Sequence, residues 1–167
     1  AHALRGDYET ADRLYDHVVA TRPDFTFPVA MARLRHTIWQ GDDEARRRHF
    51  TALEQIPGRQ SVLATQFARL FDEPDSLASA EQLYMPLVAG SSPRFMSLLH
   101  QMLTEGAAML GKPEIALKML DTALGAGLVD LEWVDRCPAL AALRTRPEFV
   151  RVRRTVAERA EAIWSIE

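Results

Sequence analysis

The chain has 167 residues, of which 47% are hydrophobic, and a formal net charge of -3. This length and apolar content allow one domain with a substantial core, and the small negative charge excludes a global basic field for nucleic acid. No apolar run reaches the roughly 18 residues of a membrane-spanning helix, and no signal peptide opens the chain. Cys137 is the only cysteine, so no internal disulfide can form. We therefore expect a cytoplasmic protein and, because the sequence opens without Met, a piece of a longer one.

Helices are expected along the whole chain. Gly and Pro interrupt it at wide intervals, and the stretches between them show apolar spacing of three and four. No stretch alternates with period two for long enough to predict a sheet. Pro23 and Pro57 are expected to end helices, and a third helix end is expected near Pro93. The segments around 28–39, 61–72 and 94–110 are expected to supply the partner helices.

Three helix starts carry their own signals. Ser92 followed by Pro93 predicts an N-cap with proline at the first helical position. Asp75 or Ser76 can cap the helix that contains Ala80 and Tyr84, and Thr145 and Pro147 bracket the start of the last helix.

One set of three positions recurs on the same predicted helical face: a small residue, a large residue and a further apolar residue. The set repeats with a period of 34 to 36 residues. The small residue lets two helices cross closely, and the large one fills the gap a turn later. A period of this size predicts stacked units that cannot bury their faces alone. The four sets are Ala11, Tyr15 and Val18; Ala45, His49 and Ala52; Ala80, Tyr84 and Leu87; and Ala116, Leu120 and Ala123.

The stretch GDYETADRLYDHVVATRPDF, residues 6–25, resembles a tetratricopeptide repeat (TPR) through its Gly-Asp-Tyr start, the positions above and the closing Pro23. The resemblance extends over residues 6–128, about three and a half helix–turn–helix units, and implies an all-α TPR-like α-solenoid. The first unit lacks its leading helix in this comparison. We therefore expect repeats over residues 1–128 and C-terminal capping helices over 129–167, in the same domain.

The C-terminal segment is similar to the ends of TPR regions in bacterial serine/threonine kinases, cyclases and transcriptional regulators. Its periodicity alone predicts an amphipathic helix over 147–164 that would cover the end of the solenoid. The similarity rests on Asp130, Trp133, Leu143-Arg144 and Arg146-Pro147-Glu148-Phe149. The apolar side of the helix is Phe149, Val152, Val156, Ala160 and Ile163, and the polar side is Arg151, Arg154, Glu158 and Glu161.

In the TPR family the leading helix of each unit lines a concave groove. The second unit allows two registers, because strict repeat spacing would bury Arg33 and His36. Burying an unpaired arginine costs several kcal/mol, so the apolar stripe Phe27, Met31, Leu34 and Ile38 is the better register. The Lys and Asn clamp of chaperone-binding members is absent, so chaperone tails are not expected. The resemblance implies the groove residues Arg33 or Leu34, Thr65, Arg69, Gln101 and Glu105.

We expect no catalytic residues, metal or cofactor. No two of the five histidines have the i, i+4 spacing of a helical metal pair. Cys137 precedes Pro138 in an apolar turn and is expected to be a buried, inert thiol. Gly125 and Gly127 follow a helix and predict a C-cap, not a dinucleotide loop. An enzyme would require Cys137 or a histidine in a cleft beside a base.

The remaining charged and sulfur-containing side chains have ordinary structural explanations. Arg46, Arg47 and Arg48 follow three acids, as helix-dipole and i, i+4 pairing favour, although a site for phosphate or an acidic peptide is the alternative. The carboxylates Asp72, Glu73, Asp75 and Glu81 are expected in turns and on the surface, and Met96, Met102, Met109 and Met119 in the core.

The leading expectation is a scaffold or regulatory protein–protein interaction module of a larger bacterial signalling protein, binding a peptide or partner domain on its concave face. The alternative is a sensory domain that binds a small ligand or short peptide and signals to an attached kinase, cyclase or DNA-binding effector. A sensor needs a deep polar pocket, whereas an interaction module needs an open groove or apolar patch. Direct contact with nucleic acid or membrane is not expected. Self-association through Tyr15 and Val18 of the first helix is a further expectation.

Overall fold

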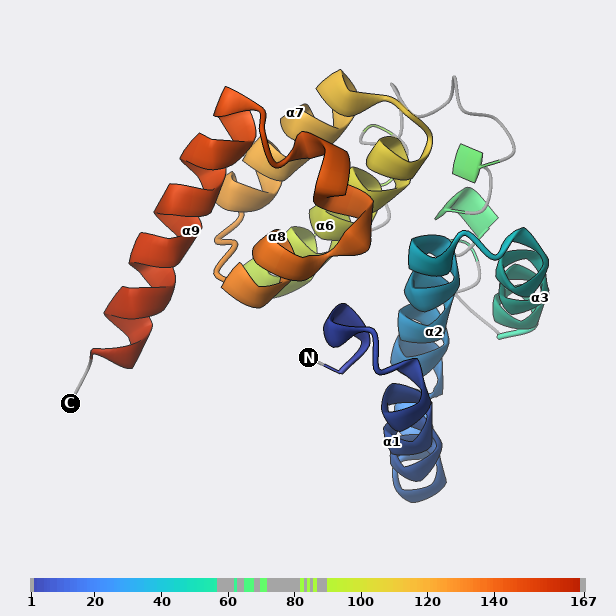
Figure 1. The fold of residues 1–167 in the computed structure, drawn as a ribbon. Helices are drawn as coiled ribbons and strands as arrows, with labels where there is room; N and C mark the ends of the chain where they lie inside the picture. The colour runs from blue at the N-terminus through green and yellow to red at the C-terminus, as the bar shows by residue number, and fades with distance from the viewer. Residues whose placement is uncertain are drawn as a thin grey trace. The chain divides into compact units, whose positions relative to one another are not determined.

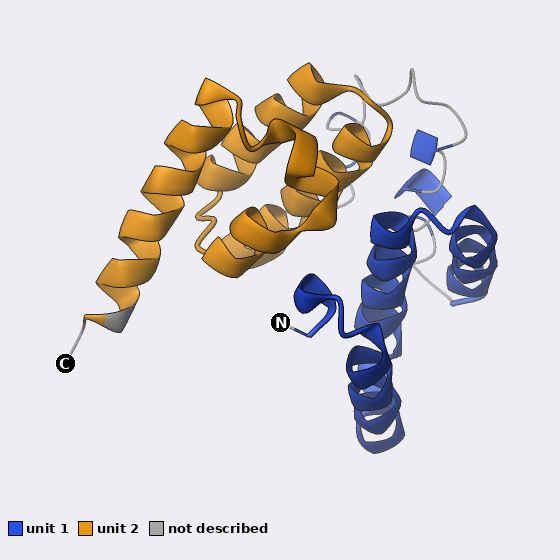
Figure 2. Cartoon of the chain, viewed as in Figure 1, with its two compact units in different colours: residues 1–87 blue, residues 88–167 orange. Residues whose placement is uncertain are grey.

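The computed structural model describes residues 2–56, 62, 65–67, 70–71, 82, 84, 86 and 90–165. These residues form helices and turns, and no strand occurs among them, so the all-α prediction is confirmed for this part of the chain. The chain divides into two compact units, residues 1–87 and 88–167 (Figure 2). Each unit is described below by itself.

Unit 1 contains two 3-10 helices and three described α-helices (Figure 1). Helix α1 packs against α2, and α2 packs against α3. The predicted helix end at Pro23 is confirmed, because α1 ends at Thr21 and Pro23 opens a 3-10 turn. In order, the elements are η1 (Ala3–Arg5), α1 (Tyr8–Thr21), η2 (Pro23–Phe25), α2 (Thr26–Gln40) and α3 (Asp43–Glu54).

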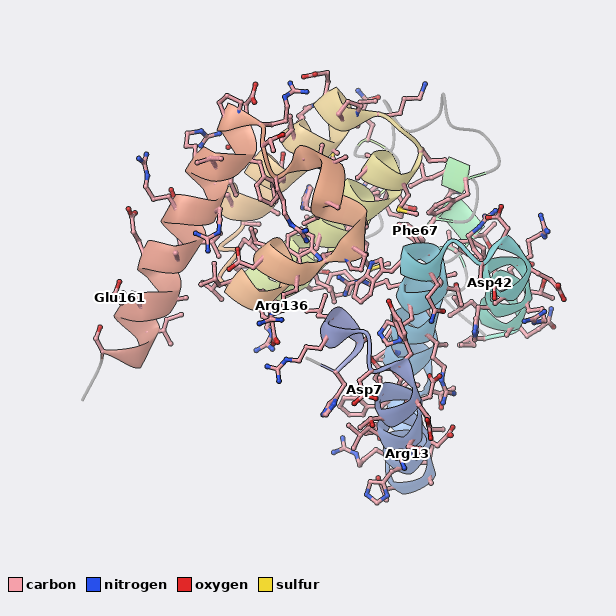
Figure 3. The ribbon with its side chains drawn as sticks, in the orientation of Figure 1. Asp7, Arg13, Asp42, Phe67, Arg136 and Glu161 are labelled. Atoms are coloured by element: carbon pink, nitrogen blue, oxygen red, sulfur yellow. The ribbon has the colours of Figure 1, made fainter. Side chains whose placement is uncertain are left out.

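Aspartates start two of these helices (Figure 3). The Asp7 carboxylate accepts a hydrogen bond from the Thr10 amide of α1, and the Asp42 carboxylate accepts one from the Ala45 amide of α3. Each cap satisfies one of the amide groups that the first turn leaves unpaired. Between α2 and α3 the chain turns at Gly41, whose φ of 69° lies in the left-handed region that glycine tolerates best.

The first two small repeat positions of unit 1 are buried, as their spacing predicts, and the third, Ala80, lies outside the described residues. Ala11 and Ala45 are 5% and 9% exposed, and the large-residue positions Tyr15 and His49 are half-buried. Ala11 is the only buried residue of α1, whereas α2 and α3 also bury larger apolar side chains. These are Val29, Leu34, Ile38, Phe50 and Leu53.

Unit 2 is a helical hairpin extended by a short return segment and a long last helix (Figure 1). Helices α6 and α7 pack together, η4 packs on α6, and α9 packs on α7 and α8. The described elements are α6 (Pro93–Met109), α7 (Pro113–Gly125), α8 (Leu131–Arg136), η4 (Pro138–Leu143) and α9 (Pro147–Trp164).

The predicted helix boundaries of unit 2 are confirmed at three places. The Ser92 hydroxyl accepts from the Phe95 amide, and Pro93 is the first residue of α6. Helix α7 ends at Gly125, and Gly127 follows with a φ of 92°. Helix α9 begins at Pro147, although its N-cap residue makes no side-chain capping bond.

Helix α9 lies along α7 in the same direction. Arg146 pairs with Glu114 near the start of α7, and Arg151 pairs with Asp121 further along both helices. The buried positions of the two helices are separated by 33 residues, from Ala116, Met119 and Ala123 to Phe149, Val152 and Val156. The predicted apolar side of α9 is confirmed up to Val156, but it does not extend to Ile163, which is 51% exposed.

Among the described residues, none of the helices combines the length and the apolar character needed to cross a membrane.

Candidate functional site

The two units carry different members of the predicted groove. Arg33 and Leu34 lie on α2, and Thr65 is a half-buried helical residue of unit 1. Gln101 and Glu105 lie on α6 in unit 2. The described residues do not include Arg69 or the carboxylates Asp72, Glu73, Asp75 and Glu81.

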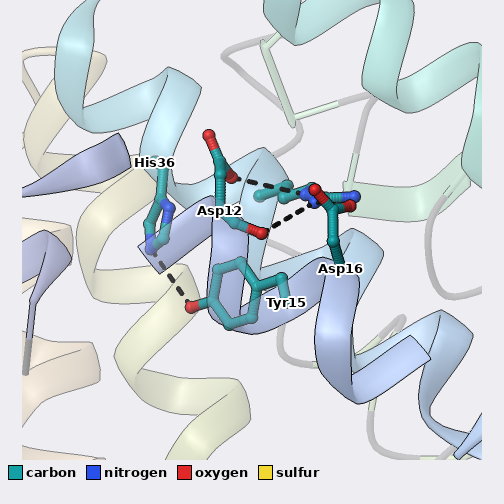
Figure 4. A network of polar contacts seen from close by, with 5 residues as sticks. Asp12, Tyr15, Asp16 and His36 are labelled. Atoms are coloured by element: carbon teal, nitrogen blue, oxygen red, sulfur yellow. Dashed lines mark hydrogen bonds and ion pairs between the residues drawn. The ribbon is translucent and has the colours of Figure 1, made fainter. Parts of the chain in front are cut away.

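Arg33 is held by two aspartates of α1 (Figure 4). Its Nη2 donates to Asp16 Oδ1 at 2.7 Å and to the Asp12 carbonyl at 3.3 Å, and its Nε lies 3.4 Å from Asp12 Oδ1. Burial alone would lower the pKa of Arg33, but the hydrogen bond and charge of Asp16, with a smaller contribution from Asp12, raise it. Arg33 therefore acts first as the polar link between α1 and α2.

The register of α2 differs in part from the prediction. Leu34 and Ile38 are buried, at 0% and 3% exposure, which confirms the apolar stripe. However, His36 is also buried, with 7% of its surface exposed, and the expectation that the stripe would leave it outside is wrong. The side chain of Arg33 keeps 27% exposure and is paired, so its position avoids the cost of an unpaired buried charge. Asp12 and Asp16 lie one helical turn apart on α1. This spacing was the sequence feature that could have predicted an acidic partner for Arg33.

An aromatic cluster encloses His36. Its ring centroid lies 5.6 Å from Tyr8, 5.5 Å from Tyr15 and 5.3 Å from Trp39. The Tyr15 hydroxyl is 3.4 Å from Nε2 of His36 (Figure 4). Tyr15 therefore faces α2, and Val18 on the same helix is half-buried. Self-association through these two residues stays a prediction.

Helix α6 has one entirely polar face that is buried. Ser97, His100, Gln101, Thr104 and Glu105 follow the spacing of three and four that defines a helix face, and each is 7% exposed or less. Side chains of these types are mostly exposed in proteins, so a buried group of them needs polar partners. The resemblance to TPR proteins predicted Gln101 and Glu105 but not the other three, although all five share the same helical spacing.

Glu105 is engaged within unit 2. Its Oε1 accepts a hydrogen bond from Trp133 Nε1 at 2.5 Å and lies 3.7 Å from Cys137 Sγ. Glu105 and Cys137 are 0% exposed and Trp133 is 1% exposed. The prediction of a buried Cys137 thiol is confirmed. Glu105 acts here as a buried acceptor that ties α8 to α6.

Ser97 and Gln101 differ from Glu105 because no hydrogen bond joins the Ser97 hydroxyl or the Gln101 amide to any described residue. The two side chains are 5% and 7% exposed. Together they offer neutral donors and acceptors of the kind that pair with a peptide group or an uncharged polar ligand.

The basic run of α3 is an ordinary helix surface. Glu44 pairs with Arg48 at 2.5 Å one turn along the helix, and Asp43 pairs with Arg46 at 3.1 Å. The Arg46 guanidinium also lies 4.9 Å from the centre of the Phe71 ring. Cation–π contact and local pairing account for Arg46 and Arg48 without a ligand.

Within the part of the chain that the structure describes, no group of three or more His, Cys, Asp or Glu side chains is arranged to hold a metal ion. Comparison of the chain with family models, with curated proteins and with solved structures found no match in any of the three. The resemblance to TPR proteins therefore remains a prediction.

Proposed function

We propose that this chain is a protein-interaction module of TPR-like helix pairs, which binds a peptide or partner domain non-covalently. The main support for this proposal is the polar face of α6. There the side chains of Ser97 and Gln101 are neutral hydrogen-bonding groups that form no hydrogen bond with a described residue. An extended peptide has one donor and one acceptor per residue, and side-chain amides and hydroxyls match both.

The similar spacing of buried positions in the two units supports the architectural part of this proposal. Ala11 and Ala45 are buried 34 residues apart in unit 1. In unit 2, the buried stripe of α9 follows that of α7 by 33 residues. Stacked units of this period would form an extended surface on which a partner can dock without a reaction.

A pull-down from a lysate of the source organism tests the proposal. The wild-type chain and the double variant Ser97→Ala, Gln101→Ala are used as baits, and bound proteins are identified by mass spectrometry. Thr155→Ala is the matched control, because it also removes a hydroxyl but lies on α9, which packs on α7 and α8. We expect a partner that the wild type and the control retain and the double variant loses, with calorimetry on the purified pair giving an affinity at least tenfold weaker for the variant.

The proposal is contradicted by a partner that all three baits retain equally, because binding would then not involve the polar face of α6. Circular dichroism of each bait distinguishes a lost contact from a lost fold.

The burial of the same face favours a second candidate function, a sensory domain. Enclosed polar groups suit a small polar ligand better than an open groove does. Thermal shift measurements against free amino acids and dipeptides would test this. A ligand that raises the melting temperature of the wild type and of Thr155→Ala, but not of Gln101→Ala, would support the sensor over the interaction module.

A further inference from the structure

Helix α1 contributes little to the buried core of unit 1. Ala11 is its only buried residue, and Leu14 is 49% exposed, whereas α2 and α3 bury several larger apolar side chains. Segments with few buried apolar side chains open locally at a lower free energy than the core does. We therefore expect α1 to open more often than α2 or α3.

One side chain of α2 contacts three residues of α1 (Figure 4). Nη2 of Arg33 donates to Asp16 Oδ1 at 2.7 Å, and Nε of Arg33 lies 3.4 Å from Asp12 Oδ1. The Cζ atom of Arg33 lies 5.9 Å from the centre of the Tyr15 ring. Asp12, Tyr15 and Asp16 have the spacing of three and four that places side chains on one helix face. A single guanidinium group therefore spans a full turn of α1.

These ion pairs lie where water and salt can reach them. The side chain of Arg33 is 27% exposed, and those of Asp12 and Asp16 are 55% and 74% exposed. Dissolved ions weaken the attraction between exposed charges, because the screening length falls from about 10 Å at 0.1 M salt to about 3 Å at 1 M. The charged part of the contact between α1 and α2 is therefore sensitive to ionic strength.

We propose that α1 opens from α2 as a unit while α2 and α3 stay packed together, and that the ion pairs of Arg33 control how often it opens. The hinge is the connection of residues 22–25, because α1 ends at Thr21 and α2 begins at Thr26. Opening separates Arg33 from both aspartates and exposes the Tyr15 ring, which the closed form keeps half-buried. This inference concerns unit 1 and does not depend on the proposed binding function.

Salt should affect α1 more than the other two helices. Leu34 of α2 and Leu53 of α3 are both 0% exposed, and the removal of apolar surface from water does not depend on charge. Screening therefore leaves the packing of α2 and α3 in place. In α1 it weakens the attraction to Arg33, so that added NaCl shifts the equilibrium towards the open form.

Hydrogen exchange of the full chain in 0.05 and 0.5 M NaCl, read by mass spectrometry and corrected for intrinsic rates, tests the inference. We expect residues 8–21 to exchange faster than residues 43–54 in 0.05 M NaCl, and their exchange to increase by about two- to fivefold in 0.5 M NaCl. Asp16→Asn should give a similar increase already at 0.05 M NaCl and a smaller response to salt. Asp121→Asn is the matched control, because it breaks an exposed Asp–Arg pair between two helices of unit 2, and it should leave the exchange of α1 unchanged.

Equal protection of α1 and α3 in 0.05 M NaCl overturns the inference, because α1 would then open only together with the rest of unit 1. A wild-type exchange rate of α1 that does not change with salt, or a full response to salt in Asp16→Asn, also overturns it, because Arg33 would then not control the opening. Circular dichroism of the variant shows whether it is folded. If it is not, the comparison of α1 with α3 in the wild type at the two salt concentrations still decides the question.

Discussion

The joint between α1 and α2 in unit 1 and the joint between α6 and α8 in unit 2 both combine an aromatic side chain with a buried polar group. In unit 1, α1 buries only Ala11 and is held by Arg33 and the ring of His36. In unit 2, Glu105 accepts a hydrogen bond from Trp133, and both side chains are fully buried. The first joint depends largely on a charged group, Arg33, whereas the second depends mainly on removing apolar surface from water.

The magnitudes explain why this difference matters. A surface ion pair contributes about 0.2–1 kcal/mol, and salt screens it. Complete burial of one large apolar side chain contributes about 1.5–3 kcal/mol, which salt and pH change little. The joint between α1 and α2 should therefore respond to changes in salt that leave the joint between α6 and α8 almost unchanged.

The largest expected effect is that of Trp133→Ala. The indole is 1% exposed, so its removal leaves a cavity that costs about 3–5 kcal/mol, and Glu105 also loses a donor. Urea denaturation would measure the loss, and hydrogen exchange would locate it over residues 93–109. Trp133→Phe keeps most of the ring and should cost clearly less. A change below 1 kcal/mol for Trp133→Ala would show that α8 does not contribute to the core of unit 2.

The apolar cores of the two units can be compared by replacing one buried leucine in each. Leu34 of α2 and Leu103 of α6 are both 0% exposed, and replacing either with alanine should cost about 2–5 kcal/mol. Exchange protection should fall over residues 26–40 for Leu34→Ala and over 93–109 for Leu103→Ala. If Leu34→Ala cost much less than its counterpart, the core of unit 1 would be looser than its burial indicates.

Helix caps should have intermediate effects. Asp130→Ala removes the carboxylate that accepts from the Trp133 amide, and Asp42→Ala removes the corresponding cap of α3. Each change should cost about 1 kcal/mol. The Asn variants, which keep an acceptor, serve as controls; if they are as unstable as the Ala variants, capping is not the cause.

Acidification should weaken unit 1 through His49 by a smaller amount. The pKa of His49 is lowered by burial and by Arg33, so the folded state favours the neutral ring and loses stability as the pH falls below about 6.5. His49→Tyr should reduce this loss, because tyrosine stands at the matching positions 15 and 84 and carries no charge at these pH values. Denaturation curves at pH 7.5 and 5.0 would measure it, and an identical pH response in the variant would exclude His49 as a contributor.

The smallest expected effect is that of Asp121→Asn, which breaks the exposed ion pair with Arg151 on α9. We expect a loss of about 0.2–1 kcal/mol at low salt, which 0.5 M NaCl should abolish. A larger, salt-independent loss would mean that charge, and not the buried stripe of Phe149, Val152 and Val156, holds α9 in place.

The candidate site shows where prediction from the sequence stops. The apolar stripe predicted Leu34 and Ile38 correctly because burial of a helix face follows from spacing along that helix. The same stripe missed His36, whose burial depends on Tyr15 from another helix. Gln101 and Glu105 were predicted together as groove residues, yet only Glu105 has a hydrogen bond to α8. No spacing along α6 distinguishes the two.

For the described residues, the sequence by itself determined the helices, the caps at Ser92 and Gly127, and the buried alanines Ala11 and Ala45. These features depend on residues within one or two turns of each other. Only the tertiary structure decided the partners of the polar groups. Arg33 reaches Asp16 across 17 residues, His36 reaches Tyr15 across 21, and Glu105 reaches Trp133 across 28. A charged or hydrogen-bonding side chain takes its partner from whatever the folded chain brings within about 3 Å, and local periodicity carries no information about that choice.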